Sequence, residues 1–184
     1  GLGVMGFPMA GHLSEHNKIA VFNRTKTKSE IWSTKYKGEI CSSPAGVAKI
    51  SDVIILCVGD DNDVRDIVTG HQGLLNNLKS GSIIVDHTTT SAKLAKEMYE
   101  LLNSNNVSYI DAPVSGGEVG AQSGKLSIMV GGNKDAYDQI KNILSPYTRL
   151  IKYMGLSGSG QYTKMVNQIC IAGLIQALAE GINF

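Results

Sequence analysis

The sequence predicts an α/β protein: a doubly wound, mostly parallel sheet, followed by the start of an all-helical C-terminal domain. Strand-like and helical stretches alternate through residues 1–155, which is the pattern of βαβ units. From Gln161 to Phe184 the chain is apolar, compatible with a helix and free of strand signals. We therefore predict a sheet domain over residues 1–155. A connector and the first long helix of a helical domain are predicted over residues 156–184.

Short β-rich runs alternate with helical stretches in the predicted sheet domain. Because right-handed crossovers bring the carboxyl ends of parallel strands to one edge, ligands are expected at the loops that follow the strands. On the last helix, one face would carry Met165, Ile169, Ala172 and Gln176. The expected strands are Lys18–Phe22, Val53–Val58, Ser82–Asp86, Val107–Asp111, Ser127–Val130 and Leu150–Tyr153, and the expected helices are Pro8–His16, Lys26–Tyr36, Asn62–Val68, Ser91–Leu102 and Lys134–Leu144.

The bulk composition is that of an ordinary globular protein. With 42% hydrophobic residues and a net charge of +1, the chain gives no reason to expect a nucleic acid or an anionic membrane as partner. Three scattered cysteines, Cys41, Cys57 and Cys170, form neither a disulfide framework nor a metal-binding spacing. No apolar run is expected to reach membrane-spanning length. A cytoplasmic location is therefore expected, with the mitochondrial matrix left open because a targeting peptide could precede Gly1.

A glycine motif opens the chain. Gly1-Leu2-Gly3-Val4-Met5-Gly6 matches G-x-G-x-x-G, in which the glycines allow a tight turn, a close approach to pyrophosphate and packing of helix on strand. The following helix would turn its N-terminus, with free N–H groups, toward the phosphates. This predicts a Rossmann-type dinucleotide-binding domain, with an ordinary glycine turn as the alternative. Such a motif normally follows a strand, so we expect a first strand that the chain lacks.

The nature of the dinucleotide is indicated by Asn23-Arg24-Thr25, directly after the expected strand Lys18–Phe22. An acidic residue about 20 residues after the glycines would grip the ribose 2′-hydroxyl of NAD. Here an amide, a guanidinium and a hydroxyl stand in its place, and these suit a 2′-phosphate. NADP is therefore expected in preference to NAD. The alternative is that Arg24 stacks on adenine or faces solvent.

Two further groups indicate a small acidic substrate. Ser115-Gly116-Gly117 follows a strand and offers backbone N–H groups beside a hydroxyl, a good receptor for a carboxylate. Lys164 lies early in the last helix, with Asn167 and Gln168 three and four residues later and near its face. A lysine among amides can exchange the proton of a hydroxyl or carbonyl. Taken singly, an ordinary turn and a solvated lysine remain the simpler explanations.

Together these motifs resemble the β-hydroxyacid dehydrogenase family. The residues concerned are Gly-Leu-Gly-x-Met-Gly-x-x-Met-Ala, Asn-Arg-Thr, Asp-Ala-Pro-Val-Ser-Gly-Gly and Lys-Met-Val-Asn-Gln, and the resemblance spans Gly1 to Phe184. Within the family, the group around 3-hydroxyisobutyrate dehydrogenase and the tartronate and glyoxylate/succinic semialdehyde reductases looks most similar. The resemblance implies a Rossmann domain, an all-helical C-terminal domain and usually a homo-oligomer, a dimer or tetramer.

The resemblance also implies roles for individual positions. It assigns Lys164 as catalytic acid/base. Asp86-His87-Thr88-Thr89 stands where the family often has Asp-x-Ser-Thr, and Asn167-Gln168 where many members carry two asparagines. The implied cofactor residues are Gly1, Leu2, Gly3, Val4, Met5, Gly6, Asn23, Arg24, Thr25, Val58, Gly59 and Thr89, and the implied substrate residues are Ser115, Gly116, Gly117, Asn167 and Gln168.

The expected activity is hydride transfer between NADP(H), or NAD(H), and a small β-hydroxyacid or semialdehyde. One alternative is a decarboxylating 6-phosphogluconate-type dehydrogenase, whose lysine helix usually carries a histidine where Asn167 stands. Another is a non-catalytic dinucleotide-binding adaptor, against which the presence of Lys164 argues. No metal is expected: His12-Leu13-Ser14-Glu15-His16 matches H-x-x-E-H, but it falls on the helix after the glycine turn.

Overall fold

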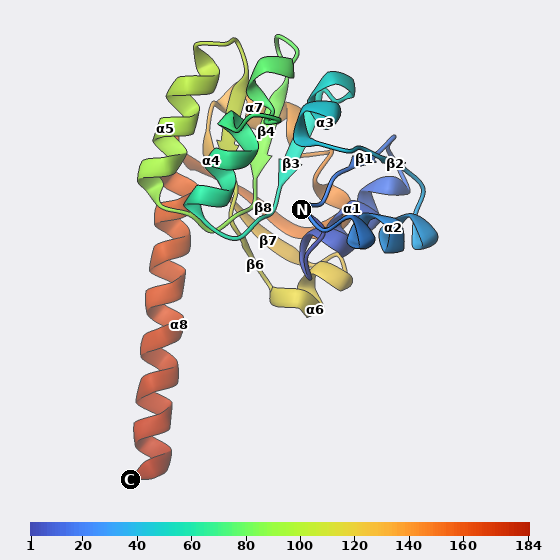
Figure 1. The fold of residues 1–184 in the computed structure, drawn as a ribbon. Helices are drawn as coiled ribbons and strands as arrows, with labels where there is room; N and C mark the ends of the chain where they lie inside the picture. The colour runs from blue at the N-terminus through green and yellow to red at the C-terminus, as the bar shows by residue number, and fades with distance from the viewer.

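Helices and strands alternate along the first 155 residues, as the sequence predicts (Figure 1). The computed structural model describes every residue, Gly1–Phe184. The strands are β1 (Ala20–Val21), β2 (Glu39–Ile40), β3 (Val53–Leu56), β4 (Ile83–Asp86), β5 (Ser108–Asp111), β6 (Val114–Ser115), β7 (Leu126–Gly132) and β8 (Thr148–Gly155). The α-helices are α1 (Gly6–Ser14), α2 (Lys26–Lys35), α3 (Pro44–Ile50), α4 (Asp61–Thr69), α5 (Ala92–Asn103), α6 (Gly117–Gln122), α7 (Lys134–Ile140) and α8 (Ser159–Asn183).

The main sheet is parallel at one end and mixed at the other. Strands β3, β4 and β5 run parallel, whereas β7 is antiparallel to both β5 and β6 and parallel to β8. The antiparallel part was not predicted. Strand β7 follows β6 after residues 116–125 only, a connection shorter than the dozen or more residues that a parallel crossover needs.

The register sets the carboxyl ends of the parallel strands level with one another. Leu56 pairs with Asp86, and Asp86 pairs with Asp111, at the last positions of β3, β4 and β5. The loops that follow these strands therefore begin at the same edge, which we call the rim. The rim carries the predicted site residues from Val58 to Ser115.

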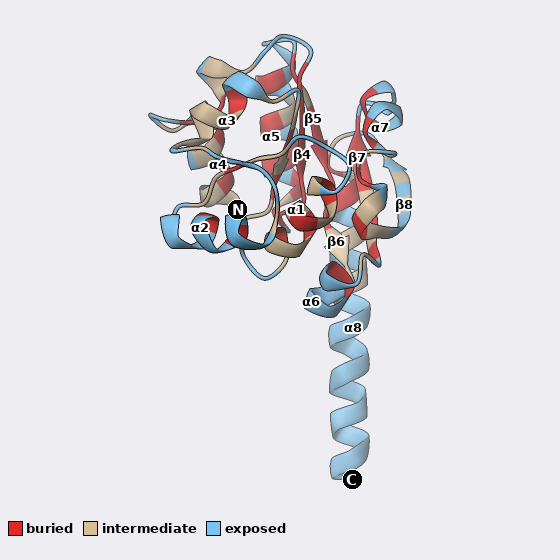
Figure 2. Cartoon of the chain, turned by 90° about the vertical axis from the view of Figure 1, so that its right-hand side faces the viewer, coloured by how far each residue is buried: buried red, intermediate tan, exposed pale blue.

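Helices cover both faces of the sheet, and the strands between them form the core (Figure 2). On one face Met9 and Leu13 of α1 pack with β-strand residues such as Ile128. On the other, Leu94 and Met98 of α5 pack with α4 and with alternate residues of the strands. Each such side chain contributes about 1.5–3 kcal/mol when fully buried.

Local signals account for several helix ends. Ser91 accepts a hydrogen bond from the Leu94 N–H and caps α5, and Asp60 caps α4 through the N–H groups of residues 62 and 63. Helix α3, which the sequence analysis missed, follows the cap Ser43 with a proline in its first turn. The helix expected to reach Leu144 ends at Ile140, and a short 3₁₀ turn over Ser145–Tyr147 follows it.

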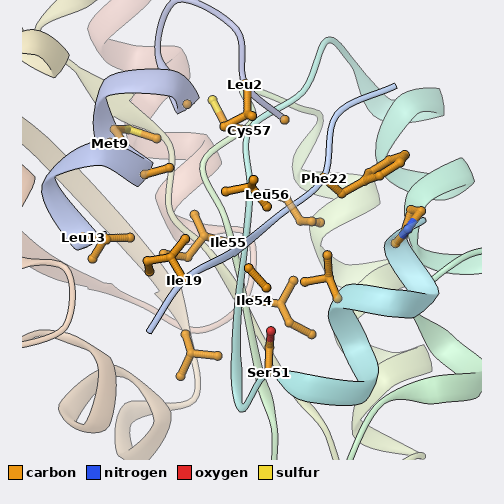
Figure 3. A pocket seen from close by; sticks show the side chains of 18 of the residues that line it. Leu2, Met9, Leu13, Ile19, Phe22, Ser51, Ile54, Ile55, Leu56 and Cys57 are labelled. Atoms are coloured by element: carbon orange, nitrogen blue, oxygen red, sulfur yellow. The ribbon is translucent and has the colours of Figure 1, made fainter. Parts of the chain in front are cut away.

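An apolar cleft separates β1 from β3. Strand β1 pairs with β2, and β3 pairs with β4, but β1 and β3 are not hydrogen-bonded to each other. The cleft has a volume of about 470 Å³, and aliphatic side chains such as Ile19, Ile54 and Leu56 project into it (Figure 3). Gly1, Leu2 and Gly6 of the glycine motif are among the residues that line it, whereas Lys164 and Ser115 are not.

Helix α8 extends away from the rest of the chain (Figures 1 and 2). Only Gly160 and Gln161 are buried among its residues, and the face predicted from Met165 to Gln176 is exposed. By length and composition alone, α8 could cross a membrane: an 18-residue window has mean hydropathy 1.4, and none of it is buried. The expectation that no run reaches such a length was therefore wrong, because Lys164 and Glu180 are too widely spaced to interrupt it.

Candidate cofactor and active site

The glycine loop has the shape that its motif requires. A Cβ on Gly1 would lie 2.5 Å from the Cys57 carbonyl oxygen, and one on Gly6 would collide with the Gly1 carbonyl oxygen. A Cβ on Gly3, in contrast, would meet nothing within 4 Å. Two glycines thus allow close packing, while the middle one leaves open space in front of α1. No side chain caps that helix at Met5, and the Phe7 N–H in its first turn donates to the Gly3 carbonyl at 2.9 Å.

The side chain of Asn23, which follows β1, is hydrogen-bonded to the glycine loop. Its Oδ1 accepts a hydrogen bond from the Leu2 N–H at 2.8 Å, and its Nδ2 donates to the Thr25 carbonyl at 3.0 Å. The predicted amide is therefore engaged in shaping the loop. Thr25 is the N-cap of α2 but makes no side-chain capping hydrogen bond, and Val4 is exposed.

Arg24 has a partner that the sequence analysis missed. Its side chain is 87% exposed, and its Nη1 lies 3.2 Å from Asp63 Oδ1 in the first turn of α4. The other oxygen of Asp63 accepts the Gly59 N–H at 3.1 Å. One carboxylate thus joins the two predicted cofactor segments. Its signal in the sequence was the acidic start of α4, Asp60-Asp61-Asn62-Asp63.

A threonine loop, Thr88–Thr90, follows β4 at the rim. The Thr88 hydroxyl accepts a hydrogen bond from the Val58 N–H at 3.1 Å and thereby ties this loop to the loop after β3. Thr88 and Thr90 are buried, whereas Thr89, the predicted cofactor residue, is exposed between them. The buried Thr90 Oγ1 has no hydrogen-bond partner.

Two buried titratable groups stand beneath the threonine loop. Asp86 accepts hydrogen bonds from the Tyr109 hydroxyl at 2.7 Å and the Thr88 N–H at 2.9 Å. Burial raises the pKa of Asp86 to about 6, although these hydrogen bonds favour the charged carboxylate and oppose the rise. His87 Nδ1 lies 2.6 Å from the Ala112 carbonyl and its Nε2 lies 2.7 Å from the Tyr147 hydroxyl. Burial lowers the pKa of His87 to about 4. We therefore assign a neutral imidazole that donates from Nδ1 and accepts at Nε2.

The predicted substrate loop is partly helical. Ser115 is half-buried in β6, and α6 begins at Gly117 where the sequence analysis expected a loop. Gly116 and Gly117 have φ angles of 136° and 61°, which side chains other than glycine rarely adopt. A Cβ on Gly117 would meet nothing within 4 Å, so this turn presents its backbone to open space.

Lys164 lies in the second turn of α8 and is half-buried. Burial lowers the pKa of its ammonium group, the direction that an acid/base group working near neutral pH requires. Asn167 is also half-buried, whereas Gln168 is exposed and accepts a hydrogen bond from Asn167 Nδ2 at 3.2 Å. Lys164 and Asn167 thus share the less exposed side of this part of the helix.

Asp111 fixes the start of α8 at the rim. Its Oδ1 accepts the Gly158 N–H at 2.8 Å and its Oδ2 accepts the Gln161 N–H at 3.0 Å. Burial raises the pKa of this carboxyl, and these N–H groups oppose the rise. A Cβ on Gly160 would lie 2.5 Å from the Met129 carbonyl, so the helix start packs closely on β7 as well.

The side chain of Gln161 joins α8 to the threonine loop. Its Oε1 accepts the Thr90 N–H at 3.1 Å, and its Nε2 donates to the Thr88 carbonyl at 2.8 Å. The structure thereby brings the predicted lysine helix against the predicted cofactor rim. Ser115 and Lys164 are linked less directly: α8 packs on β7, and β7 pairs with β6, the strand that carries Ser115.

Such a rim defines a class of protein: a dinucleotide-binding α/β domain that carries a lysine helix at the edge of its site. Residues 1–155 match the NAD binding domain of 6-phosphogluconate dehydrogenase. An uncharacterized oxidoreductase of Shewanella frigidimarina is 46% identical over the whole chain, which covers 64% of that relative. The chain therefore spans less than two thirds of the length of this relative.

Solved structures of similar proteins have the same fold as this chain. A 3-hydroxyisobutyrate dehydrogenase of Mycobacterium tuberculosis with L-serine has a TM-score of 0.92 at 28% identity, over 98% of this chain and 61% of its own. Psf3 in complex with NADP+ and 2-OPP has a TM-score of 0.90 at 27% identity, over 100% of this chain and 66% of its own. The chain belongs to the β-hydroxyacid dehydrogenase family.

Proposed function

We propose that the protein containing this chain is an oxidoreductase. It transfers hydride between NADP(H), or NAD(H), and a small β-hydroxyacid or its semialdehyde, with Lys164 as acid/base. The observation that carries the proposal is Lys164 itself. Its ammonium group has a pKa lowered by burial, and its helix is hydrogen-bonded to the cofactor rim through Gln161.

The cofactor supplies the hydride acceptor or donor. During oxidation, neutral Lys164 Nζ takes the proton of the substrate hydroxyl while a hydride leaves the carbon that bears it, and a C=O bond forms. During reduction, the charged ammonium returns the proton to the carbonyl oxygen. Asn167 orients that oxygen from the same side of α8. Lysine suits this exchange because its pKa moves readily on burial.

The turn at Ser115, Gly116 and Gly117 is proposed to hold the substrate carboxylate. A hydroxyl and exposed backbone N–H groups are what a carboxylate needs, and the positive φ values keep this backbone uncovered. The M. tuberculosis relative with L-serine, a small acid bearing a hydroxyl, supports this class of substrate. Gln168 would set how long a substrate can extend beyond Asn167.

The proposed preference for NADP depends on Arg24, and it is supported by the neighbour solved with NADP+. Arg24→Ala should weaken NADPH binding by about ten- to a hundredfold and NADH binding little, because a charge-assisted contact to phosphate is lost. Asp63→Asn should act in the opposite sense, since it removes a carboxylate 3.2 Å from the guanidinium. Dissociation constants from NADPH and NADH fluorescence titrations check both. Equal losses for the two cofactors in Arg24→Ala would refute the assignment.

The glycine loop gives a second prediction. Gly3→Ala should weaken NADPH binding by about tenfold or more while the thermal unfolding midpoint stays at the wild-type value, because its Cβ meets no protein atom and projects into the cofactor space. Gly6→Ala is the contrasting variant. Its Cβ collides with the Gly1 carbonyl, so both the unfolding midpoint and the affinity should fall. Wild-type affinity in Gly3→Ala would place the cofactor elsewhere.

The function is tested by assaying the full-length protein against small semialdehydes and β-hydroxyacids, with both cofactors in both directions. We expect turnover of acids with three or four carbons. Turnover of 6-phosphogluconate alone, with release of carbon dioxide, would favour the decarboxylating alternative. Cofactor binding without turnover of any substrate would favour the adaptor.

We also propose a homo-oligomer in the cytoplasm. The exposed apolar side chains of α8, such as Ile169 and Leu174, need a protein cover in a soluble assembly. The three cysteines are unpaired, which fits a reducing compartment.

A further inference from the structure

Gln161 is fully buried, with 0% of its surface exposed. Both ends of its amide are used on one short segment: Oε1 accepts the Thr90 N–H, and Nε2 donates to the Thr88 carbonyl. Thr89, the exposed residue between these two contacts, is thus held by a side chain that belongs to another element. The contacts span 71 and 73 residues of sequence.

Lys164 follows Gln161 by three residues on the same helix. Three residues of α-helix advance about 4.5 Å and leave the two side chains about 60° apart around the axis. The backbone at Gln161 is itself fixed, because Asp111 accepts the N–H groups of Gly158 and Gln161. The helix start therefore has one anchor on β5 and a second on the threonine loop, and Lys164 lies just beyond both.

A hydrophobic side chain of similar size could fill the same space, so packing alone does not explain an amide. Burial of an amide is unfavourable unless its donor and acceptor are both satisfied, and here both are. Removal of the amide would leave the Thr90 N–H and the Thr88 carbonyl without their partners. The buried Thr90 Oγ1 lacks a partner, so the hydrogen bond from the Thr90 N–H to Gln161 is the contact that ties Thr90 to a side chain of another element.

We propose that Gln161 is a positioning residue, which holds the Thr88–Thr90 loop, and the cofactor at Thr89, at a fixed distance from Lys164. This inference rests on the proposed function. Gln161 touches neither substrate nor cofactor in this account. Its loss should therefore lower kcat rather than raise KM, because a displacement of about 1 Å between reacting groups costs roughly 10²-fold in rate.

The test uses the full-length protein and two substitutions at Gln161. Gln161→Leu removes both hydrogen bonds, and Gln161→Glu keeps the acceptor for the Thr90 N–H. Gln139→Leu, an exposed position on α7 outside the rim, is the matched control. The measurements are kcat, KM, NADPH dissociation constant, unfolding midpoint and hydrogen exchange of the Thr90 amide.

We expect Gln161→Leu to lose about 10²-fold in kcat, with KM and NADPH affinity within about threefold of wild type, and to exchange the Thr90 amide faster. Gln161→Glu should lie between it and wild type, and Gln139→Leu should match wild type. A kcat within threefold of wild type in a folded Gln161→Leu protein overturns the inference, as does unchanged exchange at Thr90. If Gln161→Leu does not fold, Gln161→Glu with wild-type kcat and wild-type Thr90 exchange overturns it. A wild-type protein that turns over no substrate overturns the proposed function instead.

Discussion

Lys164→Met should lower kcat by roughly 10²–10⁴-fold, which is what a positioned proton-transfer group contributes. Methionine keeps the aliphatic bulk of the half-buried lysine but cannot exchange a proton. The glycine loop and the Thr88–Thr90 loop are untouched, so NADPH affinity should change little. Steady-state kinetics of the full-length variant and a fluorescence titration of NADPH give the two quantities.

Lys164→Arg separates acid/base work from simple attraction. A guanidinium carries the same charge but does not give up its proton near neutral pH, so arginine should not rescue the rate if Lys164 transfers a proton. If Lys164 only attracts the substrate carboxylate, the Lys164→Arg variant would recover much of the wild-type kcat, and the Lys164→Met variant would differ from wild type mainly by a higher KM. That outcome would remove Lys164 from the chemistry.

Asp86 and His87 should have opposite effects on stability as pH changes. His87 has a pKa of about 4 when folded, against 6.5 for a histidine exposed to water, so the folded protein binds fewer protons between these values and loses stability as pH falls. Asp86 has a folded pKa of about 6 against 3.8, so the folded protein binds more protons in that window and gains stability as pH falls. Each group changes the free energy of unfolding by about 3 kcal/mol once its titration is complete, and the two contributions oppose one another between about pH 4 and 6.

Single substitutions should reveal the two contributions. Asp86→Asn removes the aspartate contribution, so between pH 6 and 4 the free energy of unfolding should fall more steeply than in wild type as the solution is acidified, by up to about 1.4 kcal/mol per pH unit. His87→Gln removes the histidine contribution and should change the slope relative to wild type in the opposite sense over pH 6 to 4. Urea unfolding across this range measures both slopes. Parallel pH profiles for wild type and both variants would contradict the two shifted pKa values.

Much of the sheet domain could be predicted because its signals are local. Strand β3 and the first three residues of β4 are continuous apolar runs, and α5 has its cap at Ser91 and an apolar stripe through Leu94 and Met98. The glycine loop is likewise set by neighbouring residues. In contrast, β2 has only two residues, too few for a periodic signal, and the direction of β7 depends on chain connections rather than on its own sequence.

The candidate site was predicted less completely, because its supports join distant residues. Lys164, Ser115 and the glycine loop lie in recognisable motifs. Gln161 and Asp111 do not reveal their roles in sequence, since their contacts span 47 to 73 residues. His87 is similar, with a partner hydroxyl 60 residues away. Side chains that contact a ligand leave local patterns, whereas those that hold the site together become visible only in the folded chain.

The most direct test of the account follows a single hydride. Full-length protein would be given NADPH deuterated at the transferring position and a reactive semialdehyde, and the product hydroxyacid examined by NMR. We predict deuterium on the carbon that bears the new hydroxyl, formed at the wild-type rate by the native protein and slowed by about 10²-fold or more in Lys164→Met. Product without deuterium, or undiminished transfer in Lys164→Met, would contradict the proposal that this rim and its lysine helix form one dehydrogenase site.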